Sequence, residues 1–375
     1  MPEKNQPTRD KGLDTLRATA IVLVLMSHYC GFVSGRPTFG FIGRAGWAGV
    51  DLFFVLSGYL IGNQILSAIA HKEDFSLKVF FARRLLRTLP NYYVVLALYF
   101  LLPDLLNGSS TAPLWRFLTF TQNFGLGYGQ TFTHSWSLCI EEQFYLVLPL
   151  AALAVASCKH AVRIAWCIIA GAIAAGMTAR GANWITHGYD AFAAQTYYST
   201  FGRADELLPG IAIAMLKNFH GALYEKIQSK GNILLCAGLA AVLAMLYCLN
   251  EEFPNQMLST TFGYSLLAIS YALLVMAALS PDTLLSRVSV PGASSLALWS
   301  YAVYLMHKPI FMIAAPQLRE MNIDTNAPLT VALMFGAGIF GGWLLFRCVE
   351  TPFMQLRARW YPANRPSRIV PALSR

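Results

Sequence analysis

Ten long apolar stretches constrain this chain more than any other feature. Each has about 17 to 25 residues, enough for a helix to cross the hydrocarbon core of a bilayer with its backbone hydrogen bonds satisfied internally. Of the 375 residues, 56% are hydrophobic and 13% charged, whereas a soluble domain has about a quarter of its residues charged. We therefore predict an all-α, polytopic membrane helical bundle of about ten transmembrane helices. The predicted spans are residues 14–33, 46–68, 89–106, 136–157, 164–179, 201–217, 232–249, 258–279, 293–315 and 328–349.

The basic residues indicate how the bundle is oriented. The net charge is +9, and most Lys and Arg residues fall on one side when the N-terminus is placed in the cytoplasm, as the positive-inside rule requires. Topology thus accounts for the excess charge, which argues against a nucleic-acid partner. An even number of spans puts both termini in the cytoplasm. We predict one membrane domain over residues 1–360, surrounded by lipid, and a flexible cytoplasmic tail over residues 361–375.

Ionisable side chains inside the spans are the candidates for function, because each costs a few kcal/mol to place at the centre of a bilayer. The seven histidines fit no metal-binding spacing, so no metal is expected. Arg180 follows the fifth span and is expected in an outer loop. The candidates nearer the outside are His28, Asp51, Glu141, Glu142, Arg203, Asp205, Glu206 and His307, and those nearer the cytoplasm are Asp14, Arg17, Arg84, Arg87 and Glu350.

Arg17 and His28 share one face of the first predicted helix. Eleven residues bring the chain back to within about 20° of the same stripe, about 16 Å further along the axis. The helix would then hold an anion near the cytoplasm and an imidazole deep in the bilayer, with Asp14 orienting the guanidinium. The alternative is that Arg17 only anchors the helix at the interface and His28 is a core histidine.

The densest polar stretch is residues 134–145, where Ser137, Glu141 and Tyr145 fall on one helix face. Only one of the two adjacent glutamates is expected to face His28, and Glu141 is the candidate. A carboxylate beside an imidazole fixes its tautomer, which suits general acid-base chemistry. The alternative is that Ser137 caps the helix and the acids are favoured by the helix dipole.

Arg84 and Arg87 lie one helical turn apart at the cytoplasmic start of the third span. Two guanidinium groups on one face would clamp a phosphate. Anchoring by the positive-inside rule, or contact with anionic lipid, explains the same cluster equally well. With Arg17 at a similar depth, phosphate binding is favoured.

Seven motifs follow one another along nearly the whole chain. They are Gly12 to Arg17 with His28, Gly49 to Gly58, Arg83 to Arg87 with Pro90, Trp136 to Leu138 with Glu141, Gln143, Phe144 and Tyr145, Arg203 to Asp205 with Gly210, Ser300 and Tyr301 with Tyr304, Leu305 and His307, and Glu350 with Pro352. Together they resemble the acyltransferase type three family of membrane O-acyltransferases, which modify hydroxyls, chiefly of glycans. One departure is Lys308, where relatives commonly carry an aromatic residue.

The resemblance implies a cytoplasmic acyl-CoA donor, usually acetyl-CoA, an outward-facing glycan or lipid-linked sugar as acceptor, and no permanently bound cofactor. It places the chain in a bacterial inner membrane and implies that Arg17 and His28 are required. We expect Arg17, Arg84 and Arg87 to hold the donor's phosphates. His28, oriented by Glu141, would take the acceptor's proton or carry the acyl group transiently. The expected acceptor-side or supporting residues are Asp14, Asp51, Ser137, Gln143, Tyr145, Arg203, Asp205, Tyr304 and His307.

The alternative class is a transporter or flippase of a lipid-linked sugar or small metabolite, in which the buried charges would line a translocation path. The sequence does not identify the acceptor. Trp115, Tyr128, Trp184 and Tyr197 would stack on sugar rings, although the aromatic belt of any membrane protein uses the same residues.

Overall fold

A computed structural model describes residues 10–106, 112–250 and 256–362. Every regular element in these residues is a helix, so the predicted all-α class is confirmed. The long elements are α1 (Lys11–Tyr29), α3 (Gly49–Ala70), α4 (Leu77–Leu101), α6 (Trp136–Ala156), α7 (Ala161–His187), α9 (Leu208–Phe219), α11 (Gly231–Asn250), α12 (Gln256–Leu279), α14 (Ala293–Glu320), α15 (Pro328–Leu345) and α16 (Thr351–Trp360). The short ones are η1 (Cys30–Ser34), α2 (Gly40–Ala45), η2 (Gly46–Ala48), α5 (Leu114–Leu118), η3 (Thr133–Ser135), η4 (Phe192–Tyr197), α8 (Thr200–Arg203), η5 (Ala204–Leu207), α10 (Gly221–Gln228), α13 (Leu284–Arg287) and η6 (Phe346–Glu350). Most of the predicted tail, residues 363–375, lies outside the described residues.

Eight helices in the described part of the chain are long and apolar enough to cross a bilayer, and each coincides with one of the predicted spans to within one residue or extends beyond it. The prediction was least accurate for the span at 164–179. There α7 continues to His187 and carries Arg180 inside a 27-residue helix. Arg180 is fully buried, so its placement in an outer loop was wrong. The count of ten spans and the cytoplasmic position of both termini stay predictions.

The other two predicted spans, residues 89–106 and 201–217, are largely helical, but neither is one continuous apolar helix. Residues 89–101 of the span predicted at 89–106 form the second half of α4, and residues 102–106 follow the helix. The first half of α4 carries Arg84 and Arg87, so the apolar pattern alone missed its start. That start is capped by Ser76, whose hydroxyl accepts a hydrogen bond from the Val79 amide at 3.3 Å. The span at 201–217 is broken into α8, η5 and α9.

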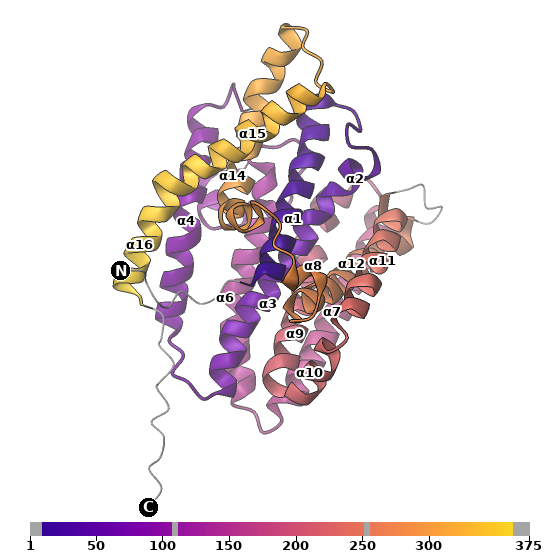
Figure 1. Ribbon diagram of the computed structural model, residues 1–375, viewed down its shortest axis with the longest axis vertical. Coiled ribbons are helices and arrows are strands. Elements are labelled where there is room, and N and C mark those ends of the chain that lie inside the picture. Colours follow the sequence, from indigo (N-terminus) through magenta and orange to yellow (C-terminus); the bar gives the residue numbers. More distant parts are fainter. Residues whose placement is uncertain (1–9, 107–111, 251–255, 363–375) are drawn as a thin grey trace, which may run out of the picture.

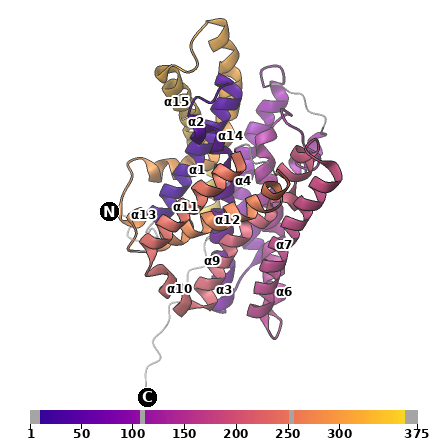
Figure 2. The same cartoon turned by 90° about the vertical axis from the view of Figure 1, so that its right-hand side faces the viewer.

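The bundle has two ends that matter for the site. The α3–α4 connection and α10 lie at the lower end in Figure 1, and α2 and the α14–α15 connection lie at the upper end. α1 packs against both α3 and α14 in the interior, whereas α6 and α7 lie side by side along one edge (Figure 2). The positive-inside rule predicts that the lower end faces the cytoplasm.

Two glycines bring α3 against the broken helix. A Cβ on Gly58 would collide with the carbonyl of Leu207, and one on Gly210 would collide with the carbonyl of Val55. The backbones of α3 and α9 therefore approach as closely as small residues allow, as is common between membrane helices. This contact fixes the position of η5 and the charged residues on it.

Candidate active site

Three histidines from distant parts of the chain form one cluster. His28 Nδ1 lies 2.6 Å from His307 Nε2, and the His134 ring centroid is 5.8 Å from that of His307. His307 Nδ1 lies 2.8 Å from the carbonyl oxygen of Val303. A carbonyl oxygen only accepts hydrogen bonds, so His307 Nδ1 carries a proton. The unprotonated Nε2 of His307 then accepts a hydrogen bond from the protonated Nδ1 of His28. This assignment leaves Nε2 of His28 without a proton and therefore basic.

His307 is thus the hydrogen-bond partner of His28, the position in which we predicted the carboxylate of Glu141. Glu141 accepts a hydrogen bond from Ser57 Oγ at 2.8 Å and lies 4.0 Å from Arg84 Nη2. The expected His28–Glu141 pair is therefore not formed. The neighbouring Glu142 also faces Arg84, 3.5 Å from its Nε. Which helices would meet at the imidazole depends on packing across α1, α6 and α14, and this has no signal in the sequence.

Lys308 is buried beside the histidine cluster. Its side chain is only 3% exposed, and its Nζ lies 4.6 Å from the centroid of the Phe32 ring. The Phe32 ring also contacts His28, and the centroids of these two rings are 5.3 Å apart. A cation over an aromatic face is stabilised electrostatically. The residue that departs from the family pattern therefore brings positive charge close to the reactive imidazole.

His28 lines the largest of the described cavities, which has a volume of about 720 Å³. Tyr128, Trp184 and Tyr197 also line it, whereas Trp115 is 57% exposed on α5 and lies outside this cavity. Burial raises the pKa of the Tyr128 phenol, so it stays a hydrogen-bond donor at neutral pH. The remaining aromatic lining is Phe32, Trp47, Trp136, Tyr189, Phe192, Tyr198, Tyr264 and Tyr304.

A second cavity of about 420 Å³ contains the predicted arginines. Arg17, Arg84 and Arg87 line it together with Ser137 and Tyr145, so one cavity brings together residues from α1, α4 and α6. The guanidinium of Arg84 lies 3.9 Å from the centroid of the Tyr145 ring. Asp14 is buried one turn before Arg17 on α1, and its effect on that guanidinium stays a prediction.

Tyr304 and Val50 line both cavities. The Tyr304 hydroxyl donates to the carbonyl of His134 at 2.6 Å and lies 2.8 Å from Ser137 Oγ. Ser137 therefore bonds across the bundle instead of capping α6, and the alternative interpretation of this residue was wrong. The cavity with the arginines and the cavity lined by His28 thus meet at Tyr304 and Val50.

Asp51 and Arg203 lie behind the aromatic cavity and do not line it. Arg203 Nη2 donates to Asp51 Oδ1 at 3.0 Å, and its Nε bonds Glu206. All three side chains are fully buried. The guanidinium lies 4.0 Å from the centroid of Tyr264 and 5.1 Å from that of Trp136, two residues of the cavity wall. Of the two expected roles, acceptor-side or supporting, this position corresponds to the supporting one.

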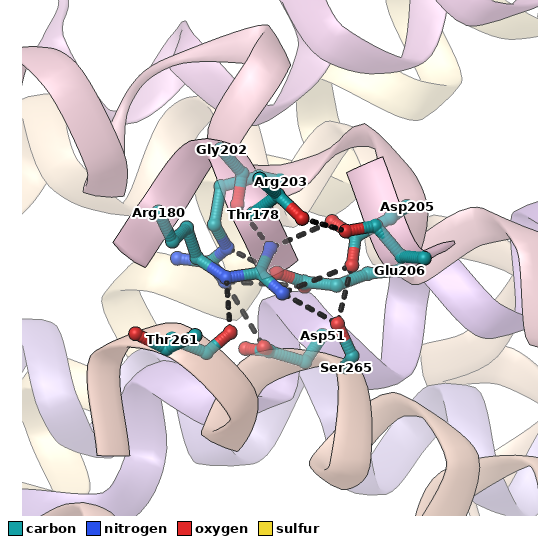
Figure 3. A network of polar contacts seen from close by, with 10 residues as sticks. Asp51, Thr178, Arg180, Gly202, Arg203, Asp205, Glu206, Thr261 and Ser265 are labelled. Carbon is teal, nitrogen blue, oxygen red and sulfur yellow. Dashed lines mark hydrogen bonds and ion pairs between the residues drawn. The ribbon is translucent and has the colours of Figure 1, made fainter. Parts of the chain in front are cut away.

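Asp205 points the other way, to the arginine that the sequence placed in a loop (Figure 3). Arg180 Nη1 and Nη2 donate to its two carboxylate oxygens at 2.8 and 3.1 Å, a bidentate pair. Further bonds from Arg180 reach the carbonyls of Gly202 at 2.7 Å and Thr261 at 3.1 Å. Asp205 therefore joins α7 and α12 to η5 and does not contact the aromatic cavity.

Gln143 is also a structural residue. Its Nε2 donates to the carbonyl of Phe120 at 2.7 Å and to Asn123 Oδ1 at 3.1 Å, and its Oε1 accepts from Thr200 Oγ1 at 2.6 Å. It therefore connects α6 to the loop after α5 and to the start of α8. No cluster of metal-ligating side chains is found in residues 10–106, 112–250 and 256–362.

The fold and the site together define a helical membrane bundle in which an arginine cavity and a histidine-lined cavity share Val50 and Tyr304. The chain belongs to the acyltransferase 3 family, whose model, described as an acyltransferase domain, matches residues 10–347. This confirms the resemblance seen in the motifs.

Curated relatives are bacterial proteins named as O-acetyltransferases. The chain is 29% identical over 362 residues to the peptidoglycan O-acetyltransferase OatA of Listeria monocytogenes, an alignment covering 91% of this chain and 55% of that protein. It is 25% identical over 360 residues to the O-acetyltransferase OatA of Staphylococcus aureus, covering 91% of this chain and 56% of that protein. The chain thus spans about half the length of these relatives. No solved structure matches.

Proposed function

We propose that this protein transfers an acyl group, most simply acetyl, from cytoplasmic acyl-CoA to a hydroxyl of a glycan on the other side of the membrane. The observation that carries the proposal is the position of His28. Its basic Nε2 belongs to a residue that lines the aromatic cavity, and that cavity shares Tyr304 with the arginine cavity. A thioester that enters the arginine cavity would reach Tyr304, where this cavity meets the one lined by the base, His28.

The positive charges of the arginine cavity identify it as the proposed binding site of the acyl-CoA donor. Acyl-CoA carries a diphosphate, and Arg17, Arg84 and Arg87 surround the cavity that would take it. Glu141 and Glu142 hold Arg84 in place. The pantetheine arm would then extend past Ser137 and put the thioester carbonyl beside Tyr304.

The chemistry requires one base and one acid. His28 Nε2 accepts the proton of the acceptor hydroxyl while the hydroxyl oxygen attacks the carbonyl carbon of the thioester. The C–S bond then breaks, and the imidazolium returns the proton to the sulfur, which leaves as free CoA. His307 holds the imidazole in the required tautomer. The ammonium of Lys308, which lies near the Phe32 ring that also contacts His28, would favour the negative charge that develops on the carbonyl oxygen.

The aromatic cavity supports a sugar acceptor. Tyr and Trp rings have an apolar face and a polar group at the edge. A pyranose ring also has an apolar face and polar hydroxyls at its edge, so the two kinds of ring can stack. The relatives named as peptidoglycan O-acetyltransferases support a cell-wall polysaccharide as the class of acceptor. The cavity volume of about 720 Å³ is in the range of ligand sites.

Trp184→Ala is expected to raise the KM for the glycan acceptor by about tenfold, because loss of one aromatic contact costs roughly 0.5 to 1.5 kcal/mol beyond the buried area. The KM for acetyl-CoA should not change. The measurement is acceptor-dependence of acetyl transfer by the purified variant. Trp115→Ala, which removes a tryptophan outside the cavity, is the matched control and should behave as wild type. Equal effects of the two substitutions would argue against the aromatic cavity as the acceptor site.

The activity itself is tested with purified protein in liposomes, radiolabelled acetyl-CoA and peptidoglycan fragments, with no ion or substrate gradient. We expect label to appear in base-labile esters on the glycan. A transporter would instead move a lipid-linked sugar across the bilayer without consuming acetyl-CoA. Accumulation of sugar with no acetyl-CoA consumption would therefore overturn the proposal.

A further inference from the structure

A third cavity continues from the arginine cavity toward the α3–α4 connection. Its volume is about 420 Å³, and Arg83 and Arg357 line it. Arg84 and Arg87 line both this outer cavity and the inner one. Four guanidinium groups and two carboxylates, those of Glu73 and Asp74, therefore line one space at the end of the bundle that is predicted to face the cytoplasm. The guanidinium groups outnumber the carboxylates, so the space would attract a polyanionic ligand.

Arg357 comes from a part of the chain that the family match does not include. The match ends at residue 347, whereas Arg357 lies on α16, which packs against α4. Arg83 Nη1 donates to the carbonyl of Tyr361, just after α16 ends, and so fastens this helix over the cavity. In the part of the chain that the structure describes, Nε of Arg357 is buried without a hydrogen-bond partner. The buried donor is thus available to a ligand.

We infer that the outer cavity binds the 3′-phosphate of the adenosine part of acyl-CoA, with Arg357 and Arg83 as the phosphate ligands. The inference rests on the proposed acyl-CoA donor. A thioester at Tyr304 puts the pantetheine in the inner cavity, and Arg84 and Arg87, which line both cavities, are then placed for the diphosphate. The remaining phosphate must lie on the outer side, where Arg83 and Arg357 are the arginines that the inner cavity lacks.

The test compares acetyl-CoA with acetyl-dephospho-CoA, which lacks only the 3′-phosphate. Wild-type protein is expected to have a KM about ten- to a hundredfold higher for the dephospho donor, the typical effect of losing a charge-assisted hydrogen bond. Arg357→Gln should raise the KM for acetyl-CoA by a similar factor and leave the KM for acetyl-dephospho-CoA unchanged. The kcat should be unchanged with either donor, because the substituted group is remote from His28.

Two further variants make the result specific. Arg359→Gln changes an exposed arginine on the same helix and should leave both KM values as in wild type. Arg87→Gln, at the proposed diphosphate position, should raise both KM values. If Arg357→Gln weakens both donors equally, or neither, the 3′-phosphate assignment is wrong and the residue is an anchor for lipid headgroups. If wild-type protein uses neither donor, the proposed function itself fails.

Discussion

His28→Ala is expected to lower the rate of acetyl transfer by about 10²- to 10⁴-fold, the usual contribution of a positioned general base. The substitution removes the one ring nitrogen that is basic and belongs to a residue lining the aromatic cavity. Donor binding should be retained, because the arginines belong to a different cavity. The measurements are single-turnover transfer of radiolabelled acetyl and equilibrium binding of CoA to the purified variant.

The matched control is His160→Ala, which removes an exposed histidine at the start of α7. It should transfer acetyl at the wild-type rate. His307→Gln is a useful intermediate, because it keeps a polar partner for His28 Nδ1 but no longer fixes the tautomer, and it should lose less activity than His28→Ala. Transfer by His28→Ala at a rate close to wild type would refute the role of this residue as base.

Arg203→Ala is expected to cost about 3 to 5 kcal/mol of stability, because it leaves Asp51 and Glu206 buried without their counter-charge. The loss should appear as a lower unfolding temperature in detergent, followed by tryptophan fluorescence and by size-exclusion chromatography. Arg287→Ala is the control. It breaks an ion pair whose two side chains are 64% and 69% exposed, and such pairs contribute about 0 to 1 kcal/mol.

A second variant separates the charge imbalance from the loss of packing. Replacing the whole buried group, with Asp51→Asn, Arg203→Met and Glu206→Gln together, removes the uncompensated charges and should recover part of the stability. If this triple variant is no more stable than Arg203→Ala, the charges are not the cause of the loss. Wild-type stability of Arg203→Ala would contradict the prediction outright.

The apolar pattern predicted most of the fold because the bilayer imposes one length and one period on every span. Eight of the ten predicted spans correspond to helices that are long and apolar enough to cross a bilayer. The exceptions occur where charge interrupts the pattern. α4 begins with basic residues, α7 continues through Arg180, and the segment with Asp205 and Glu206 breaks into short pieces. A hydropathy profile treats a buried ion pair as the end of a span.

Relations within one helix were predicted better than relations between helices. The helical period indicates that Arg17 and Tyr145 each share a face with other polar residues, and both line the arginine cavity. The partner of His28 was wrong because the choice between Glu141 and His307 depends on how α1, α6 and α14 pack. His134 was missed as a member of the cluster because it precedes α6 in a short helical turn after Phe132, which has a left-handed backbone (φ 54°).

The meeting of two cavities at Val50 and Tyr304 also bears on the cell's energy supply. Any protein that joins a cytoplasmic cofactor to an external polymer risks giving protons and ions a path down their electrochemical gradient. Here Val50 and Tyr304 line both cavities, and the Tyr304 hydroxyl is already hydrogen-bonded to the His134 carbonyl and lies beside Ser137 Oγ. In the proposed transfer the acyl group would pass these two side chains, whose packing would limit the leakage of protons and ions from one cavity to the other.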